Sequence, residues 1–71
     1  MESKEEKFKR IAEYRTKKIL HSLKVLGNCS NNRVYIYTDE EVKKIFNTLK
    51  EQVEATRAKF IAGKENNSFK L

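Results

Sequence analysis

Cys29 and His21 are the side chains of this sequence best suited to nucleophilic chemistry or metal binding. A cysteine–histidine pair would need the chain to fold back over about two helical turns, and no third residue that would orient the pair is evident. A zinc site would need several further ligands. We therefore expect no catalytic site and no metal site, and interpret Cys29 as a polar-loop residue and His21 as a surface residue.

Phosphate-binding and acid–base motifs are also missing from the sequence. The only glycines, Gly27 and Gly63, cannot form a glycine-rich phosphate loop. The carboxylates of Glu40 and Glu41 are explained by helix capping. We expect a non-enzyme without a cofactor or a small-molecule substrate.

A row of basic and aromatic residues follows alternating four- and three-residue steps, which places it on one face of a helix. The row consists of Arg10, Tyr14, Lys17, His21 and Lys24. Such a face can follow a phosphate backbone. The same segment carries Glu5, Glu6 and Glu13, so a solvated face of mixed charge stays open as the alternative. Candidate nucleic-acid contacts are Arg10, Lys17, Lys18, Lys24, Arg33 and Tyr35.

Arg33 and Tyr35 lie in "NNRVYIY", residues 31–37. The asparagines favour a turn. The alternation that follows predicts a short extended segment, with Val34 and Ile36 on the side that closes the fold and Tyr35 on the other. Arginine beside an exposed tyrosine is a combination enriched at binding sites. The alternative is that Tyr35 and Tyr37 both fill the small core.

The element that must position the basic row is a helix over about 4–26. Ser3 and Glu6 form a capping box at its start, and Gly27 is expected to stop it in a left-handed conformation. Its apolar side, the first stripe, consists of Phe8, Ile11, Ala12, Ile19, Leu23 and Leu26. Arg15 lies within this stripe, where an unpaired charge is costly, so we expect it to reach Glu54, Glu51 or a connector carbonyl.

A second helix is predicted over about 39–62. Thr38 and Glu41 form its capping box, and Tyr37 is expected to pack on Val42. Gly63 is expected to end this helix and leave a frayed tail over 63–71. Its apolar side, the second stripe, consists of Val42, Ile45, Phe46, Leu49, Val53, Thr56 and Phe60.

These elements predict an all-α fold: one antiparallel two-helix hairpin domain over 1–71 with a partly extended connector over 27–37. Two helices bury a thin core, so we expect dimerisation into a four-helix bundle or docking on a partner. A monomer whose connector folds over the open side is the alternative. Candidate partner-interface residues are Arg15, Leu20, Val25, Tyr35 and Ile61.

Composition limits the possible partners. The 71 residues carry 16 basic and 10 acidic side chains, a net charge of +6, which favours anionic partners and argues against an acidic DNA mimic. No apolar run is long enough for a membrane span or a signal peptide, so a cytoplasmic location is expected. Neither helix-turn-helix, ribbon-helix-helix nor basic helix-loop-helix patterns fit the chain, so sequence-specific base readout is not expected.

Three segments resemble small uncharacterised helical proteins of Firmicutes phages and mobile genetic elements: "KRIAEYRTKKILHSLKVLGNCSN", "YIYTDEEVKKIF" and a closing "AKF". The resemblance covers about residues 9–60. It implies a small accessory factor but no activity. The leading hypothesis is a non-enzymatic accessory or regulatory protein that binds nucleic acid through its basic face. The alternative is an adaptor or inhibitor that docks on a host or element-encoded protein.

Overall fold

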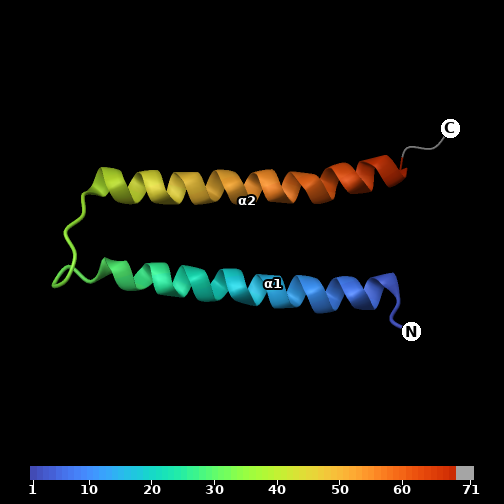
Figure 1. Ribbon diagram of the computed structural model, residues 1–71. Coiled ribbons are helices and arrows are strands. Elements are labelled where there is room, and N and C mark those ends of the chain that lie inside the picture. Colours follow the sequence, from blue (N-terminus) through green and yellow to red (C-terminus); the bar gives the residue numbers. More distant parts are fainter. Residues whose placement is uncertain (69–71) are drawn as a thin grey trace. The chain divides into compact units, whose positions relative to one another are not determined.

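The structure is a computed structural model that describes the backbone of residues 1–68 and the side chains of residues 1–63. Residues 1–68 form two α-helices, α1 over Lys4–Gly27 and α2 over Asp39–Ser68, and a short 3-10 helix, η1, over Asn28–Ser30 (Figure 1). No strand occurs within these residues. The predicted all-α fold class and the helix–connector–helix order of the predicted hairpin are confirmed.

The chain divides into two units. The first covers Met1–Ile36 and holds α1, η1 and a turn, and the second begins at Tyr37 and holds α2. The single domain, the antiparallel pairing and the dimer expected from the sequence stay predictions.

The start of α1 confirms Ser3 as its cap. Ser3 has an extended backbone, and its Oγ accepts a hydrogen bond from the Glu6 N–H at 3.1 Å. The Ser3 hydroxyl in turn donates to the Glu6 carboxylate at 3.3 Å, where the expected donor was the Ser3 backbone N–H. Because an N-cap satisfies an amide that has no helical partner, this short polar motif is enough to begin the helix.

The end of α1 differs from the expectation. Gly27 is the last residue of the helix and has right-handed angles, φ −58° and ψ −27°, so the predicted left-handed stop is wrong. No residue of the described chain has a positive φ. The physical reason is that α1 passes directly into η1, whose tighter turn is also right-handed. The Asn28 N–H still bonds to the carbonyls of Leu26 and Val25.

The start of α2 is a complete capping box. The Thr38 N–H donates to the Glu41 carboxylate at 2.8 Å, and the Glu41 N–H donates to Thr38 Oγ1 at 3.1 Å. The Thr38 hydroxyl also donates to the same carboxylate at 3.0 Å. The predicted start of the second helix is therefore confirmed, whereas the packing of Tyr37 on Val42 stays a prediction.

The end of α2 lies beyond the expected position. The helix continues through Gly63 to Ser68, so the predicted end near 62 and the frayed tail are wrong for 63–68. The remaining part of that tail, 69–71, lies outside the described residues. A glycine inside a helix costs about 1 kcal/mol relative to alanine, which weakens a helix without ending it.

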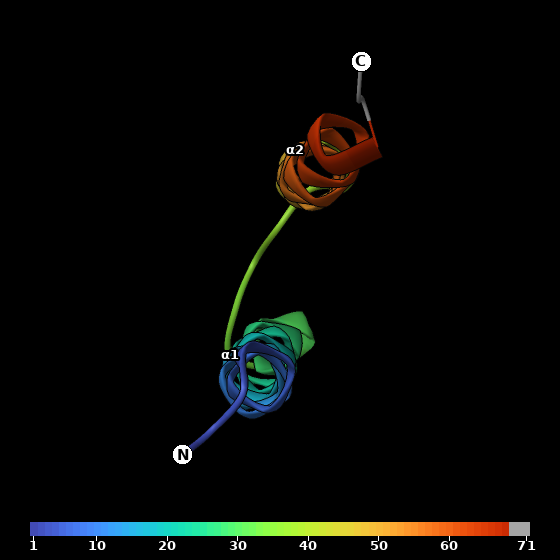
Figure 2. The ribbon, with the colours of Figure 1, turned by 90° about the vertical axis from the view of Figure 1, so that its right-hand side faces the viewer.

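Two threonines of α2 bond back to the preceding turn. The hydroxyl of Thr48 donates to the Lys44 carbonyl at 2.8 Å, and that of Thr56 donates to the Gln52 carbonyl at 2.7 Å. Bonds of this kind are associated with slight helix bending. In the view along the helices, the last turns of α2, drawn red, are offset from its earlier turns (Figure 2).

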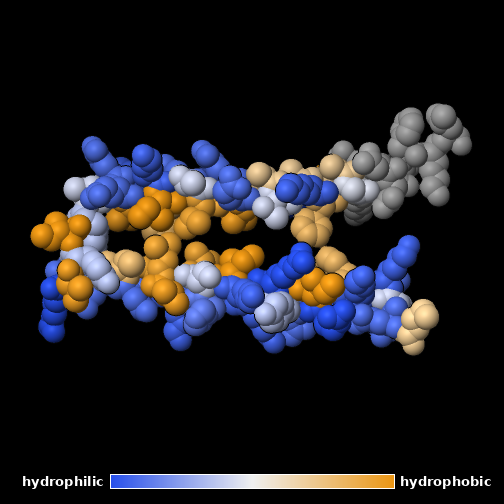
Figure 3. Space-filling model, in the orientation of Figure 1, coloured by the Kyte–Doolittle hydropathy of each residue, from blue (hydrophilic) through white to orange (hydrophobic). Residues whose placement is uncertain are grey.

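Each helix has an apolar side and a polar side, drawn orange and blue in Figure 3. None of the side chains at residues 1–63 is buried. In the first stripe Phe8, Ile19 and Leu23 are exposed, and in the second stripe Phe46, Val53 and Phe60 are. The half-buried positions are Ile11, Ala12, Leu26, Val42 and Leu49. Both amphipathic patterns predicted from the sequence are thus present on regular helices.

Candidate nucleic-acid interface

The candidate nucleic-acid contacts all lie in the first unit. Arg10, Lys17, Lys18 and Lys24 are on α1, and Arg33 and Tyr35 follow η1. All six side chains are exposed. Residues 1–36 contain nine basic and four acidic side chains, a net charge of +5, whereas residues 37–71 contain seven and six, a net charge of +1. Most of the positive charge of the protein is therefore carried by this unit.

Arg10 is held by a carboxylate from the segment before α1. Its Nε donates to Glu2 Oε2 at 2.9 Å, and its Nη2 donates to Glu2 Oε1 at 3.0 Å. This two-pronged pair is favoured by the planar guanidinium, and it raises the pKa of Arg10 above its ordinary value. An incoming phosphate would have to displace Glu2 from this group.

Lys17 is also paired with a carboxylate, that of Glu13, at 3.0 Å. The two residues are one turn apart on α1, and both side chains are well exposed. Exposed pairs of this kind contribute about 0–1 kcal/mol. Lys17 must leave this carboxylate before it can contact a phosphate, but the exposed pair holds it less firmly than Glu2 holds Arg10.

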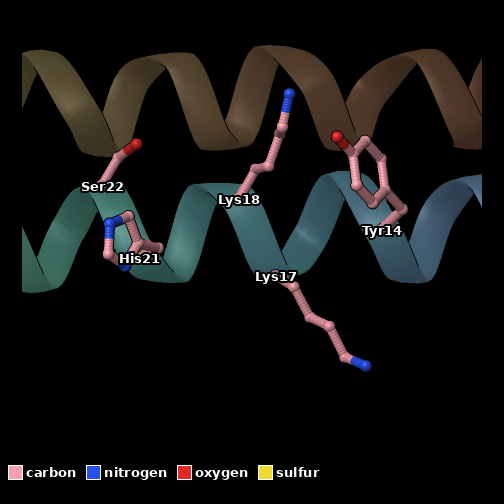
Figure 4. A pocket seen from close by; sticks show the side chains of 5 residues that line it. All are labelled: Tyr14, Lys17, Lys18, His21 and Ser22. Atoms are coloured by element: carbon pink, nitrogen blue, oxygen red, sulfur yellow. The ribbon is translucent and has the colours of Figure 1, made fainter.

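Lys18 lies over the ring of Tyr14, with Nζ 4.9 Å from the ring centroid. This is a cation–π contact between neighbours on one helix face. A shallow depression beside it is lined by Tyr14, Lys17, Lys18, His21 and Ser22. Figure 4 shows that Lys17 points to the opposite side of α1 from Lys18 and Ser22, so the five side chains do not converge on one point.

Tyr14 also borders a second depression, which is lined by Arg10, Ile11, Tyr14 and Arg15. Cationic side chains therefore lie on both sides of this tyrosine along the helix. The sequence placed Tyr14 in the basic row but did not single it out as a contact residue. The four-residue spacing from Tyr14 to Lys18 is the signal that would have identified the pair.

Arg33 and Tyr35 are positioned by a turn that begins at Asn31. The N–H groups of Val34 and Tyr35 both donate to the Asn31 carbonyl, at 3.1 and 3.0 Å. The Arg33 N–H donates to Asn31 Oδ1 at 3.1 Å, which is an Asx turn. The predicted extended alternation is therefore wrong at Arg33 and Val34, because the asparagine carbonyl and side chain curl the backbone there.

The expected closing role of Val34 and Ile36 is not observed. Val34 is 67% exposed and Ile36 is fully exposed. Tyr35 is 49% exposed, which agrees with a surface position and not with a tyrosine that fills a core. The connector therefore presents apolar and aromatic side chains to its surroundings.

The candidate partner-interface residues are divided between the units. Arg15, Leu20, Val25 and Tyr35 belong to the first unit and Ile61 belongs to α2. All five are exposed. In α2, Glu54 lies 3.9 Å from Arg57, whereas the expected pairing of Arg15 with Glu54 or Glu51 stays a prediction.

Cys29 is an exposed free thiol in η1, and His21 is an exposed residue of α1. The described residues contain no group of three or more His, Cys, Asp and Glu side chains that would hold a metal ion. Among the described residues, neither helix combines the length and the apolar character that crossing a membrane requires. The expected lack of enzymatic activity and the cytoplasmic location stay predictions.

No family model matches the chain, and no similarity is found to a curated protein or to a solved structure. The likeness to phage and mobile-element proteins stays a prediction.

Proposed function

We propose that this protein is a small non-enzymatic accessory or regulatory factor that binds nucleic acid through the cations of its first unit. The observation that carries the proposal is the net charge of +5 on residues 1–36. A polyanion gains affinity from each phosphate that a lysine or arginine neutralises, because condensed counterions are released. A phage or mobile element as its genetic context is part of this proposal.

The cations differ in how readily they can reach a phosphate. Within residues 1–36, neither Lys24 nor Arg33 forms an ion pair with a carboxylate, and both side chains are exposed. Arg10 and Lys17 must first leave Glu2 and Glu13. We therefore assign the larger share of phosphate affinity to Lys24, Arg33 and Lys18.

Binding without sequence specificity fits this set of cations better than base readout. Backbone contacts fix the position of a protein on nucleic acid but carry no sequence information. The long side chains of lysine and arginine suit such contacts, and no established base-reading motif matches the chain. The proposed activity is therefore nucleic-acid binding without sequence specificity.

Fluorescence anisotropy tests this proposal with labelled single-stranded and duplex DNA of mixed sequence at low and physiological salt. We expect binding at low salt and an affinity that falls about 10- to 100-fold when the salt concentration is raised fourfold, which corresponds to about three or four phosphate contacts. Failure to bind either probe at low salt would refute the proposal.

A second candidate function is supported by the exposed apolar side chains. Leu20, Val25 and Ile61 lie outside the two stripes and are 47% to 59% exposed. Such residues suit an adaptor or inhibitor that docks on another protein. Capture of the same protein from a host lysate with and without nuclease would favour this function, whereas nuclease-sensitive capture would favour the first.

A further inference from the structure

Tyr14 is an exposed aromatic residue surrounded by cations. Its surface is 59% exposed although Lys18 lies over the ring. Arg10 lies one turn before it and is paired with Glu2, and Lys18 lies one turn after it with its ammonium 4.9 Å from the ring centroid. Both depressions of α1 meet at this ring.

An exposed ring between cations suits an unpaired nucleobase. A base stacked on an aromatic side chain is stabilised whatever its identity, and the cations on either side can contact the phosphates before and after that base. In a duplex the bases are already stacked within the helix, so the ring would meet only sugar and phosphate. The gain from the ring is therefore available only with a single strand.

We propose that Tyr14 is a stacking platform for an unpaired base, and that the first unit consequently binds single-stranded nucleic acid in preference to duplex. This inference rests on the proposed function and names the substrate class of the same surface. The base stacks on the face of the ring that Lys18 does not cover, and Lys18 neutralises an adjacent phosphate. The hydroxyl of Tyr14 is not required, because stacking uses the face of the ring.

The test compares Tyr14→Leu, Tyr14→Phe and the unchanged protein in anisotropy titrations. The probes are a short mixed-sequence DNA strand, the RNA strand of the same sequence, the corresponding DNA duplex, and a DNA strand of equal length whose sugars carry no bases. Leucine keeps helix propensity and apolar bulk but lacks the ring, so circular dichroism should show unchanged helicity.

We expect tighter binding to the single strands than to the duplex. Tyr14→Leu should weaken single-strand binding about fivefold or more and leave duplex and abasic-strand binding within about twofold, whereas Tyr14→Phe should retain the affinity. Similar affinity for the DNA and RNA strands would show that the sugar is not read.

Tyr37→Leu is the matched control. Tyr37 belongs to the second unit, and the residues that directly follow it include Asp39 and Glu40, so the next charged side chains along the chain are acidic. Its replacement should leave the affinity for every probe unchanged.

The contrary outcomes are distinguishable. Equal affinity for single strands and duplex, or equal loss with the based and the abasic strand, would overturn the stacking role of Tyr14 while the proposed nucleic-acid function stands. Absence of binding to all four probes would overturn both.

Discussion

The first unit carries a net charge of +5 and the second unit +1, although each is built on one long amphipathic helix. In α1 the apolar stripe is interrupted by Arg15. In α2 the polar member of the stripe is Thr56, whose hydroxyl is satisfied by the Gln52 carbonyl of its own helix. A charge inside a stripe needs an outside partner, whereas a threonine that bonds its own backbone does not.

This difference indicates a division of roles. The more regular stripe of α2 suits packing against another helix, since from Phe46 to Phe60 its steps alternate between three and four residues and average the 3.5 of a helix–helix seam. The first unit combines a less regular stripe with a cationic surface. Matched substitutions in the two units test whether their roles differ in this way.

The largest effect is expected from Leu49→Asp in the second stripe. If that stripe packs against another helix, the change loses apolar burial and places an unpaired carboxylate there, so the free energy of unfolding should fall by more than about 2 kcal/mol. Thermal unfolding followed by circular dichroism measures the loss, and light scattering reports any change of assembly. Asn47→Asp, on the polar side of the same helix, is the control, and equal effects of the two would show that the stripe is not a packing surface.

The next largest effect is on DNA affinity, and it should differ between cations that are paired with a carboxylate and cations that are not. The double variant Lys24→Gln with Arg33→Gln should weaken single-stranded DNA binding about tenfold and lower the salt slope by about two, one for each lost phosphate contact. Arg10→Gln with Lys17→Gln should cost only about two- to threefold, because those cations already have carboxylate partners. Lys43→Gln with Lys44→Gln on α2 should change the affinity for DNA little. A larger loss with the Arg10 and Lys17 variant than with the Lys24 and Arg33 variant would contradict the larger share of phosphate affinity assigned to Lys24 and Arg33.

Removing a capping side chain should have a smaller effect, and the loss can be compared between the start of α1 and the start of α2. Thr38→Ala removes both hydrogen bonds of its hydroxyl with Glu41 and should lower the stability of α2 by about 1 kcal/mol. Ser3→Ala should cost about half as much, because the Ser3 hydroxyl bonds to the Glu6 carboxylate at 3.3 Å, against 3.0 Å between Thr38 and Glu41. Amide hydrogen exchange in the first turns of α1 and α2 distinguishes the two, and a larger loss with Ser3→Ala would be contrary to this prediction.

The smallest effect tests whether α2 continues through Gly63 with a helical backbone. Gly63→Ala should raise helix stability by about 0.5–1 kcal/mol, because Gly63 is inside the helix and nothing lies within 4 Å of an added Cβ. Gly27→Ala should give a smaller gain at the last residue of α1, where space is also open. Chemical denaturation measures both changes, and a loss of stability at Gly63 would indicate a left-handed glycine after all.

Local patterns were enough to predict much of this structure. The starts of both helices follow from Ser3–Glu6 and Thr38–Glu41, because capping involves side chains three residues apart and needs no distant contact. The face of the basic row follows from helical periodicity. The contact between Lys18 and the Tyr14 ring is consistent with the same pattern, because the two residues are four positions apart.

The helix ends and the connector were harder to predict. A glycine favours a left-handed stop only if the following residues leave the helix, and after Gly27 they continue as a 3-10 turn. The extended backbone expected at Arg33 and Val34 is replaced by a turn, because the N–H groups of Arg33, Val34 and Tyr35 bond to Asn31. Both errors arise because a residue's conformational preference is weaker than the hydrogen bonds its neighbours offer.

The sequence by itself determined the two helices, their capped starts, their apolar stripes and the excess of positive charge in residues 1–36, because these depend on residue type and spacing along the chain. The three-dimensional structure was needed to show which cationic side chains are paired with a carboxylate or an aromatic ring. Glu2 lies before α1 and reaches Arg10 from outside the helical repeat, and Lys18 turns its ammonium over Tyr14. Such pairings depend on where flexible side chains end in space, which periodicity does not specify.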